Sequence, residues 1–81
     1  MRVIVIKEGE DLLAVFPDQL NGDKVSCFST MDAHTEAAID WVKDQPIGTE
    51  WDKAAIYPLL EAYGYDNLTF IDEMEVAFPG C

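Results

Sequence analysis

The chain has few basic residues, and this shortage excludes several classes of protein. Five lysine and arginine residues stand against sixteen aspartates and glutamates, so the formal net charge at pH 7 is −11. On a chain of 81 residues, this charge creates a negative field that repels nucleic acid, anionic membranes and acidic substrates. We therefore expect no direct binding to nucleic acid and no membrane partner. The partners that suit this charge are basic.

Cysteine is also scarce, and long apolar runs are missing. The two cysteines, Cys27 inside an apolar run and Cys81 at the last position, do not form the dense disulfide framework of a small secreted protein. No apolar run approaches the ~20 residues that cross a bilayer. The beginning, MRVIVIKEGE, has too short an apolar stretch for a signal peptide and no small-residue cleavage site. The expected location is the cytoplasm.

Motifs of enzymes and metal proteins are missing as well. The sequence contains no phosphate-binding loop, no cluster of metal ligands and no calcium loop of the EF-hand kind. Its one conceivable nucleophile and base are Cys27 and His34. A cysteine in VSCFS more often packs as a small apolar group, and so short a chain has little room for a substrate cleft. We expect no enzyme activity, no cofactor and no bound metal.

The apolar content is sufficient for one globular domain spanning residues 1–81. Hydrophobic residues make up 49% of the chain and aromatic residues 11%, which argues against disorder. VIVI at 3–6 and LLAVF at 12–16 predict two strands of a hairpin, because Gly9 between them can take a positive φ. The turn-forming residues of PDQLNGDK at 17–24 then lead into a third strand, VSCFS at 25–29.

Two helices are predicted next. The first starts from a cap at Ser29 or Asp32 and ends near Gln45. The second starts at Thr49, three residues before Asp52. The side of this helix that faces the core is expected to carry Ala55, Ile56, Leu59, Leu60 and Tyr63.

Proline complicates the second helix, and glycine marks its end. Because Pro58 is tolerated mainly in the first turn, either the regular helix begins near Ala54 or Ala55, or the segment kinks. Gly64 fits the left-handed C′ position, with Tyr65 packing back on Leu60 in a Schellman motif. LTFIDEMEVAF at 68–78 then alternates with period two and predicts a fourth strand.

This order, β-β-β-α-α-β, predicts an α+β fold. The expected architecture is a two-layer sandwich in which two helices cover one face of a four-stranded antiparallel sheet. We place the first strand centrally, which gives the spatial order 3-2-1-4 with the last strand antiparallel to the first.

The least expected feature is a row of acidic residues at every fourth position: Asp32, Glu36, Asp40 and Asp44. In a helix these neighbours lie about 6 Å apart along the axis, and each like-charge pair costs about 0.2–0.5 kcal/mol. Their spacing approximates that of phosphates along one nucleic-acid strand, so the row could occupy a basic channel built for DNA or RNA. The alternative reading is a solvated outer face.

Two further acidic clusters extend the negative field. Asp72, Glu73 and Glu75 lie in the expected last strand, and Glu8, Glu10 and Asp11 lie in the first turn. Charged residues at sheet edges also prevent unwanted strand addition, which is the alternative explanation. The predicted partner-binding residues are Asp32, Glu36, Asp40, Asp44, Asp72, Glu73 and Glu75. Exposed aromatic side chains beside them would add to a contact surface.

Three segments carry a resemblance: LLAVFPD at 12–18, VSCFSTMDAHTEAAIDWV at 25–42 and LLEAYGYDNLTF at 59–70. In these the chain resembles small uncharacterised proteins of gut Bacteroidetes and their mobile elements, which similarly combine a VFP strand end, a cysteine-containing strand, a histidine at the helix start and a GY-x-NL exit. The resemblance implies a shared fold and an accessory or phage-associated origin, without implying an activity. In size and charge, the chain also looks like acidic phage-encoded inhibitors that mimic DNA.

Together these features predict a non-enzymatic inhibitor that engages a basic surface of a partner protein, such as a nucleic-acid-processing enzyme. The alternative is a structural or housekeeping domain, including a homodimer, whose acidic residues serve solubility alone.

Overall fold

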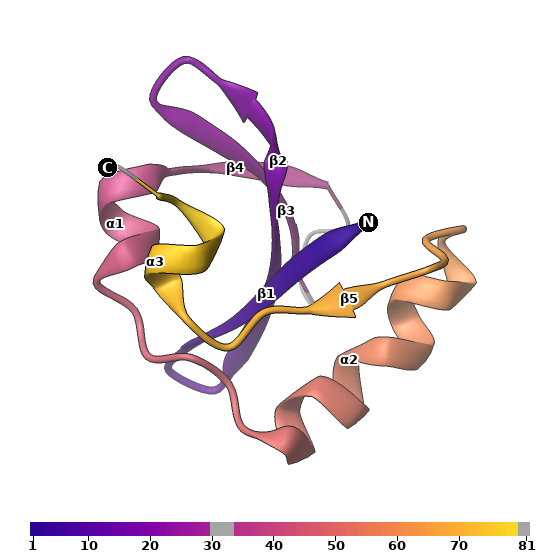
Figure 1. The fold of residues 1–81 in the computed structure, drawn as a ribbon. Coiled ribbons are helices and arrows are strands. Elements are labelled where there is room, and N and C mark those ends of the chain that lie inside the picture. Colours follow the sequence, from indigo (N-terminus) through magenta and orange to yellow (C-terminus); the bar gives the residue numbers. More distant parts are fainter. Residues whose placement is uncertain (30–33, 80–81) are drawn as a thin grey trace.

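The computed structural model describes residues 1–29 and 34–79, and it has an α+β fold with helices on both faces of one sheet (Figure 1). The strands are β1 (Arg2–Glu8), β2 (Asp11–Asn21), β3 (Lys24–Ser29), β4 (Thr35–Ala38) and β5 (Thr69–Phe70). The helices are α1 (Ile39–Lys43), α2 (Glu50–Ala62) and α3 (Met74–Ala77). The order in the sheet is β4-β3-β2-β1-β5, with β5 parallel to β1 and the other pairs antiparallel.

Two-residue turns connect the first three strands. Gly9 and Gly22 occupy the first turn positions with φ of 60° and 64°, a left-handed conformation that glycine adopts without a steric penalty. Apart from the residues adjacent in the chain, no atom of residues 1–29 and 34–79 lies within 4 Å of where a Cβ would stand at either position. Backbone conformation rather than space therefore requires the glycine. The predicted hairpin with a positive φ at Gly9 is confirmed.

β2 continues into the predicted turn segment and ends at Asn21. Val15 pairs with Cys27 and Leu20 with Val25, so residues 16–19 of β2 lie opposite the single residue Ser26. Such an irregularity accommodates Pro17, which has no N–H for a ladder hydrogen bond. The interpretation of residues 17–24 as one long turn is therefore wrong, because the strand bulges at Pro17 and resumes.

The sheet is buried on both faces. Val3 and Val5 of β1 pack under α2, while Ile4 and Ile6 pack under α1 and α3. All four are fully buried. The predicted two-layer sandwich with both helices on one face is thus wrong. The unbroken apolar runs at 3–6 and 12–16 are the pattern of strands covered on both sides.

The predicted first helix begins as a strand instead. Residues 35–38 form β4 and pair with β3, so the helix starts only at Ile39. Val25 lies opposite Ala37, which packs against the core beneath α1. Tertiary pairing here overrides the helix propensity of Glu36, Ala37 and Ala38. Of the two proposed caps, Ser29 lies in β3 and Asp32 lies outside the described residues.

α2 begins and ends as its local sequence predicts. The Asp52 N–H donates to Thr49 Oγ1 at 3.3 Å, and the Thr49 N–H donates to Asp52 Oδ2 at 2.8 Å, which completes a capping box. The hydrogen bond from Thr49 lowers the pKa of the Asp52 carboxyl. At the other end, Gly64 has φ 93°, and the Tyr65 N–H donates to the Leu60 carbonyl at 3.0 Å, which confirms the Schellman motif.

The interior of α2 differs from the prediction. Pro58 lies inside the helix, so a regular start near Ala54 is wrong. The side facing the core is also narrower than expected. Ile56 and Leu60 are buried as predicted, whereas Ala55, Leu59 and Tyr63 are exposed, and Lys53 is buried in their place.

The last segment is mostly not a strand. β5 pairs with β1 only through Thr69 and Phe70, and residues 74–77 form α3. The rest of the edge of β1 is taken by the connector before α2, because the Gly48 N–H donates to the Val5 carbonyl and the Lys7 N–H to the Pro46 carbonyl. The predicted position of the last strand beside the first is confirmed, but the antiparallel orientation and the range 68–78 are wrong.

Candidate functional site

The row of four acidic residues does not form one helical ridge. Glu36 lies in β4 opposite Ser26, so its side chain projects from the face that α2 covers. Asp40 is in α1 and Asp44 is its C-cap, on the other face. Asp32 lies outside the described residues. The predicted ridge is therefore wrong, because a strand alternates its side chains with period two where a helix would have aligned them.

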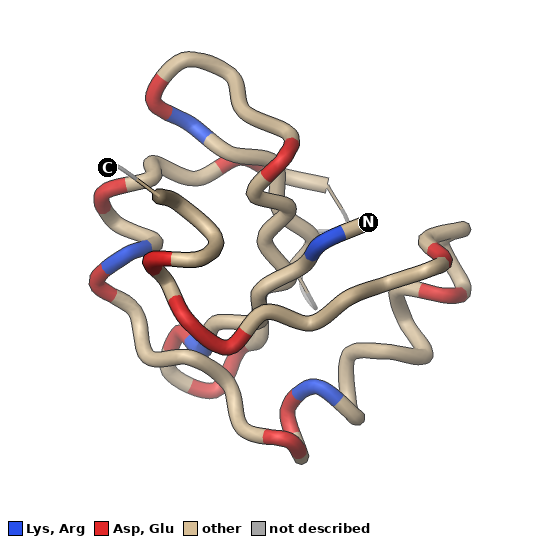
Figure 2. The backbone as a smooth tube through the Cα atoms, in the orientation of Figure 1, with Lys and Arg blue, Asp and Glu red and all other residues tan. Residues whose placement is uncertain are grey.

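A different group of carboxylates shares one side of the molecule. Val42 of α1 and Ala77 of α3 are buried in the same apolar cluster, so the two helices form one layer. Figure 2 shows acidic positions along α1 and along the segment that leads into α3. Four exposed residues of this layer make up what we call the acidic face: Asp40, Asp44, Glu73 and Glu75.

The ion pairs of the described residues do not include the acidic face. The ion pairs found among residues 1–29 and 34–79 lie elsewhere: Arg2 with Asp18, Lys7 with Asp52, and Lys53 with Glu50 and Asp72. The basic residue on α1 is Lys43, in its last turn. The Arg2 guanidinium also reaches this layer, where its Nη1 donates to the Val76 carbonyl of α3 at 3.3 Å. The four exposed carboxylates outnumber these two cations and form no ion pair within the described residues.

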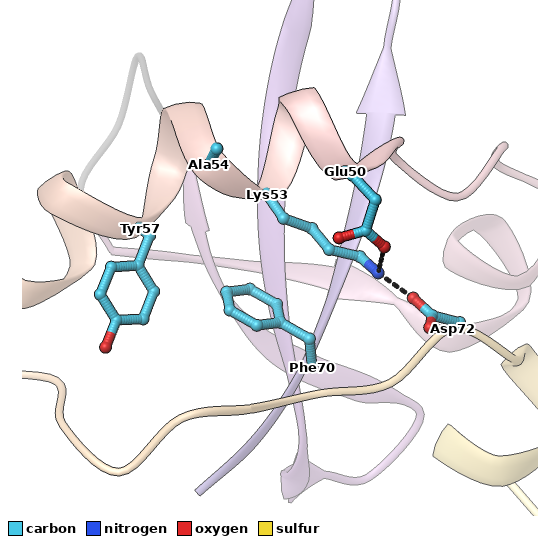
Figure 3. Close-up of a pocket in the computed structure, with 6 residues that line it drawn as sticks. All are labelled: Glu50, Lys53, Ala54, Tyr57, Phe70 and Asp72. Carbon is cyan, nitrogen blue, oxygen red and sulfur yellow. Dashed lines mark hydrogen bonds and ion pairs between the residues drawn. The ribbon is translucent and has the colours of Figure 1, made fainter.

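Asp72 belongs to a second feature, a surface groove between α2 and β5 (Figure 3). The groove has a volume of about 410 Å³ and is lined by Glu50, Lys53, Ala54, Tyr57, Phe70 and Asp72. The Lys53 side chain is only 9% exposed, and its Nζ donates to Glu50 Oε1 at 3.1 Å and to Asp72 Oδ1. This amine therefore links α2 to the chain that follows β5.

Lys53 is held in its charged form. The hydrogen bond to Asp72 is the main cause that raises the pKa of this amine above its ordinary value. A nucleophilic lysine needs the opposite shift, so Lys53 acts here as a structural cation. Lys53 is not among the site residues predicted from the sequence. Its spacing could have indicated a position facing the core, because Lys53, Ile56 and Leu60 lie on one face of a helix.

An aromatic cluster surrounds His34. Tyr65 Oη and His34 Nδ1 are 3.1 Å apart, and the Tyr63 and Phe28 ring centroids lie 6.0 and 6.3 Å from that of His34. Phe16 stacks on Tyr65, with 4.8 Å between the ring centroids. His34 is thereby placed on the α2 face of the sheet.

Cys27 lies on the opposite face. It belongs to the core beneath α1 and α3, where its Sγ donates to the Val25 carbonyl at 3.4 Å. Burial raises the pKa of this thiol to about 11. The sheet thus separates Cys27 from His34, and the two cannot act together as nucleophile and base.

We expect Cys27 to react slowly with iodoacetamide in the folded protein. In a Cys81→Ser variant at pH 8, the raised pKa alone reduces the thiolate fraction about 100-fold, and burial slows the reaction further. The rate should rise about tenfold per pH unit up to pH 10. The control is the same variant unfolded in urea. Equal rates in the folded and unfolded states would contradict this placement of the thiol.

In the described part of the chain, no three His, Cys, Asp or Glu side chains gather as a metal site. None of the described helices combines the length and apolar character needed to span a bilayer.

No protein-family model, curated protein or solved structure matches this chain.

Proposed function

We propose that this protein is a non-enzymatic inhibitor that binds a basic surface of a partner protein through its acidic face. The observation that supports this proposal is the shared layer of α1 and α3. It presents Asp40, Asp44, Glu73 and Glu75 on one side, exposed and outside the ion pairs of the described residues.

The acidic face is held in position before any partner arrives. Val42 anchors α1 and Ala77 anchors α3, and both side chains are buried in one core. Like charges fixed near one another repel, and a cationic partner relieves this repulsion. The long-range field of the whole molecule, with a net charge of −11, also accelerates encounter with a basic surface.

The partner that suits this surface is a protein that binds nucleic acid. Asp40 and Asp44 are four residues apart, and the rise of a helix separates such residues by about 6 Å along its axis, close to the spacing of backbone phosphates. The mechanism is occlusion: the inhibitor occupies the cationic channel and nucleic acid is excluded. We extend the proposal to a mobile-element or phage origin and a cytoplasmic location, supported by the resemblance in sequence and composition described above.

The test is a panel of purified nucleases, polymerases and helicases, titrated with the protein by fluorescence anisotropy. We expect at least one enzyme to bind, with an affinity that falls at least tenfold between 50 and 300 mM NaCl because exposed charges are screened. Duplex DNA should compete for the same site. Absence of binding across the panel at 50 mM NaCl, or a complex insensitive to salt and DNA, rejects the proposal.

A homodimer is the second candidate, and the outer side of α2 favours it. Trp51 is 86% exposed and Leu59 is 40% exposed, so α2 presents two large apolar side chains to solvent. Sedimentation equilibrium distinguishes the candidates. A measured mass of twice the chain mass of 9.1 kDa, which falls to the mass of one chain in the Trp51→Glu variant, would support the dimer.

A further inference from the structure

We propose that the groove between α2 and β5 binds an extended segment of a partner protein, which adds to the sheet as a strand beside β5 and carries a lysine or arginine two residues from an apolar side chain. This inference goes beyond the proposed function, because none of the four residues of the acidic face lines the groove.

β5 offers an open edge. It is the last strand in the order of the sheet, and β1 is its neighbour on one side. The Thr69 N–H donates to the Met1 carbonyl and the Ile71 N–H to the Val3 carbonyl, both at 2.8 Å. Because main-chain groups alternate sides along a strand, the Phe70 N–H and C=O point to the outer edge. Within the described residues, no hydrogen bond outside the β1–β5 pairing involves them.

α2 forms the wall above this edge. Figure 3 shows Tyr57 and Phe70 at one end of the groove and the charged side chains at the other. The Tyr57 and Phe70 ring centroids are 6.0 Å apart, and Ala54 completes the apolar part. A helix beside an open strand edge is the arrangement in which strand addition supplies main-chain hydrogen bonds while alternate side chains of the peptide enter the groove.

The charged end favours a basic side chain. The Glu50 and Asp72 side chains are 87% and 65% exposed, whereas the Lys53 side chain between them is 9% exposed. A ligand therefore meets two carboxylates and little of the ammonium group. An added lysine or arginine would be attracted, and an acidic side chain would be repelled.

The same charges disfavour a second copy of this chain as the occupant. Pairing of two β5 edges would bring the Asp72 carboxylate of each chain toward the acidic groove of the other, between molecules that each carry a net charge of −11. Like charges placed together across an interface weaken it.

The experiment selects seven-residue peptides from a display library on the intact protein and then measures synthetic, end-capped versions. We expect the enriched peptides to carry a basic and an apolar residue two positions apart, because alternate side chains of a strand enter the groove. Binding should slow hydrogen exchange of the Phe70 amide at least tenfold, because that N–H gains a partner. The Thr69 and Ile71 amides, already bonded to β1, should change less. Citrulline in place of arginine should weaken binding about tenfold.

Protein variants locate the site. Tyr57→Ala should weaken the peptide at least tenfold. The control, in which Asp40, Asp44, Glu73 and Glu75 are changed to their amides, should bind the peptide within about threefold of wild type, so this test is independent of the proposed function. Failure to enrich any peptide, binding insensitive to Tyr57→Ala, or an unchanged Phe70 amide overturns the inference.

Discussion

Leu60→Ala is expected to lower the free energy of unfolding by about 2–5 kcal/mol, whereas Leu59→Ala should lower it by less than about 1 kcal/mol. The two leucines are adjacent in α2, but Leu60 is 0% exposed and Leu59 is 40% exposed. Both substitutions remove the same atoms and change helix propensity equally. The difference between them therefore measures the burial of Leu60 in the cluster that contains Phe16 and Ile56.

Urea unfolding followed by circular dichroism measures both values. Domains of this size have a total stability of only about 4–12 kcal/mol, so Leu60→Ala consumes a large share of it. Ile56→Val, which removes one methylene from the same cluster, should cost about 0.5–1.5 kcal/mol and leaves a folded protein to measure. Equal losses for the two leucine variants would mean that a different side of α2 faces the sheet.

Neutralising the acidic face should remove most of the affinity for a basic partner. We expect Asp40→Asn, Asp44→Asn, Glu73→Gln and Glu75→Gln together to weaken binding roughly 30- to 500-fold at 50 mM NaCl, for the enzyme identified in the panel. In the proposed complex these carboxylates contact the partner, so their neutralisation removes short-range attraction as well as long-range steering.

The matched control changes an equal number of exposed carboxylates elsewhere: Glu8→Gln, Glu10→Gln, Glu61→Gln and Asp66→Asn. Both variants raise the net charge by four, from −11 to −7. The control should weaken binding less than about tenfold, because it alters only the long-range field. Anisotropy titrations at several salt concentrations compare them. Equal losses for both variants would show that net charge alone drives binding, and would reject the acidic face as the contact surface.

Features that depend on neighbouring residues were predictable. The turn at Gly9, the capping box of Thr49 with Asp52, and the Schellman motif at Gly64 each involve hydrogen bonds or φ angles within about five residues. Such interactions are nearly the same in any tertiary setting. The sequence also carried an unused signal, because its continuous apolar runs at 3–6 and 12–16 indicate a sheet covered on both faces.

The candidate site was predictable only in part. The excess of carboxylates follows from composition. Of the seven predicted residues, five lie at α1 or in the chain around the start of α3: Asp40, Asp44, Asp72, Glu73 and Glu75. Glu36 projects from the other face, and Asp72 pairs with Lys53. No local pattern specifies that α1 and α3 share a core, because that contact joins residues more than thirty positions apart.

The sequence by itself determined the charge, the turns, the caps of α2 and the supply of apolar residues, since each depends on composition or on a few adjacent side chains. Tertiary structure decided that residues 35–38 pair as a strand, that β5 is short and parallel, and which carboxylates lie together. The physical reason is competition for sheet edges. Residues 35–38 pair with the edge of β3, whereas the connector at 46–48 and β5 both pair with the edge of β1. These pairings join segments that are distant in the sequence, so local propensity does not specify them.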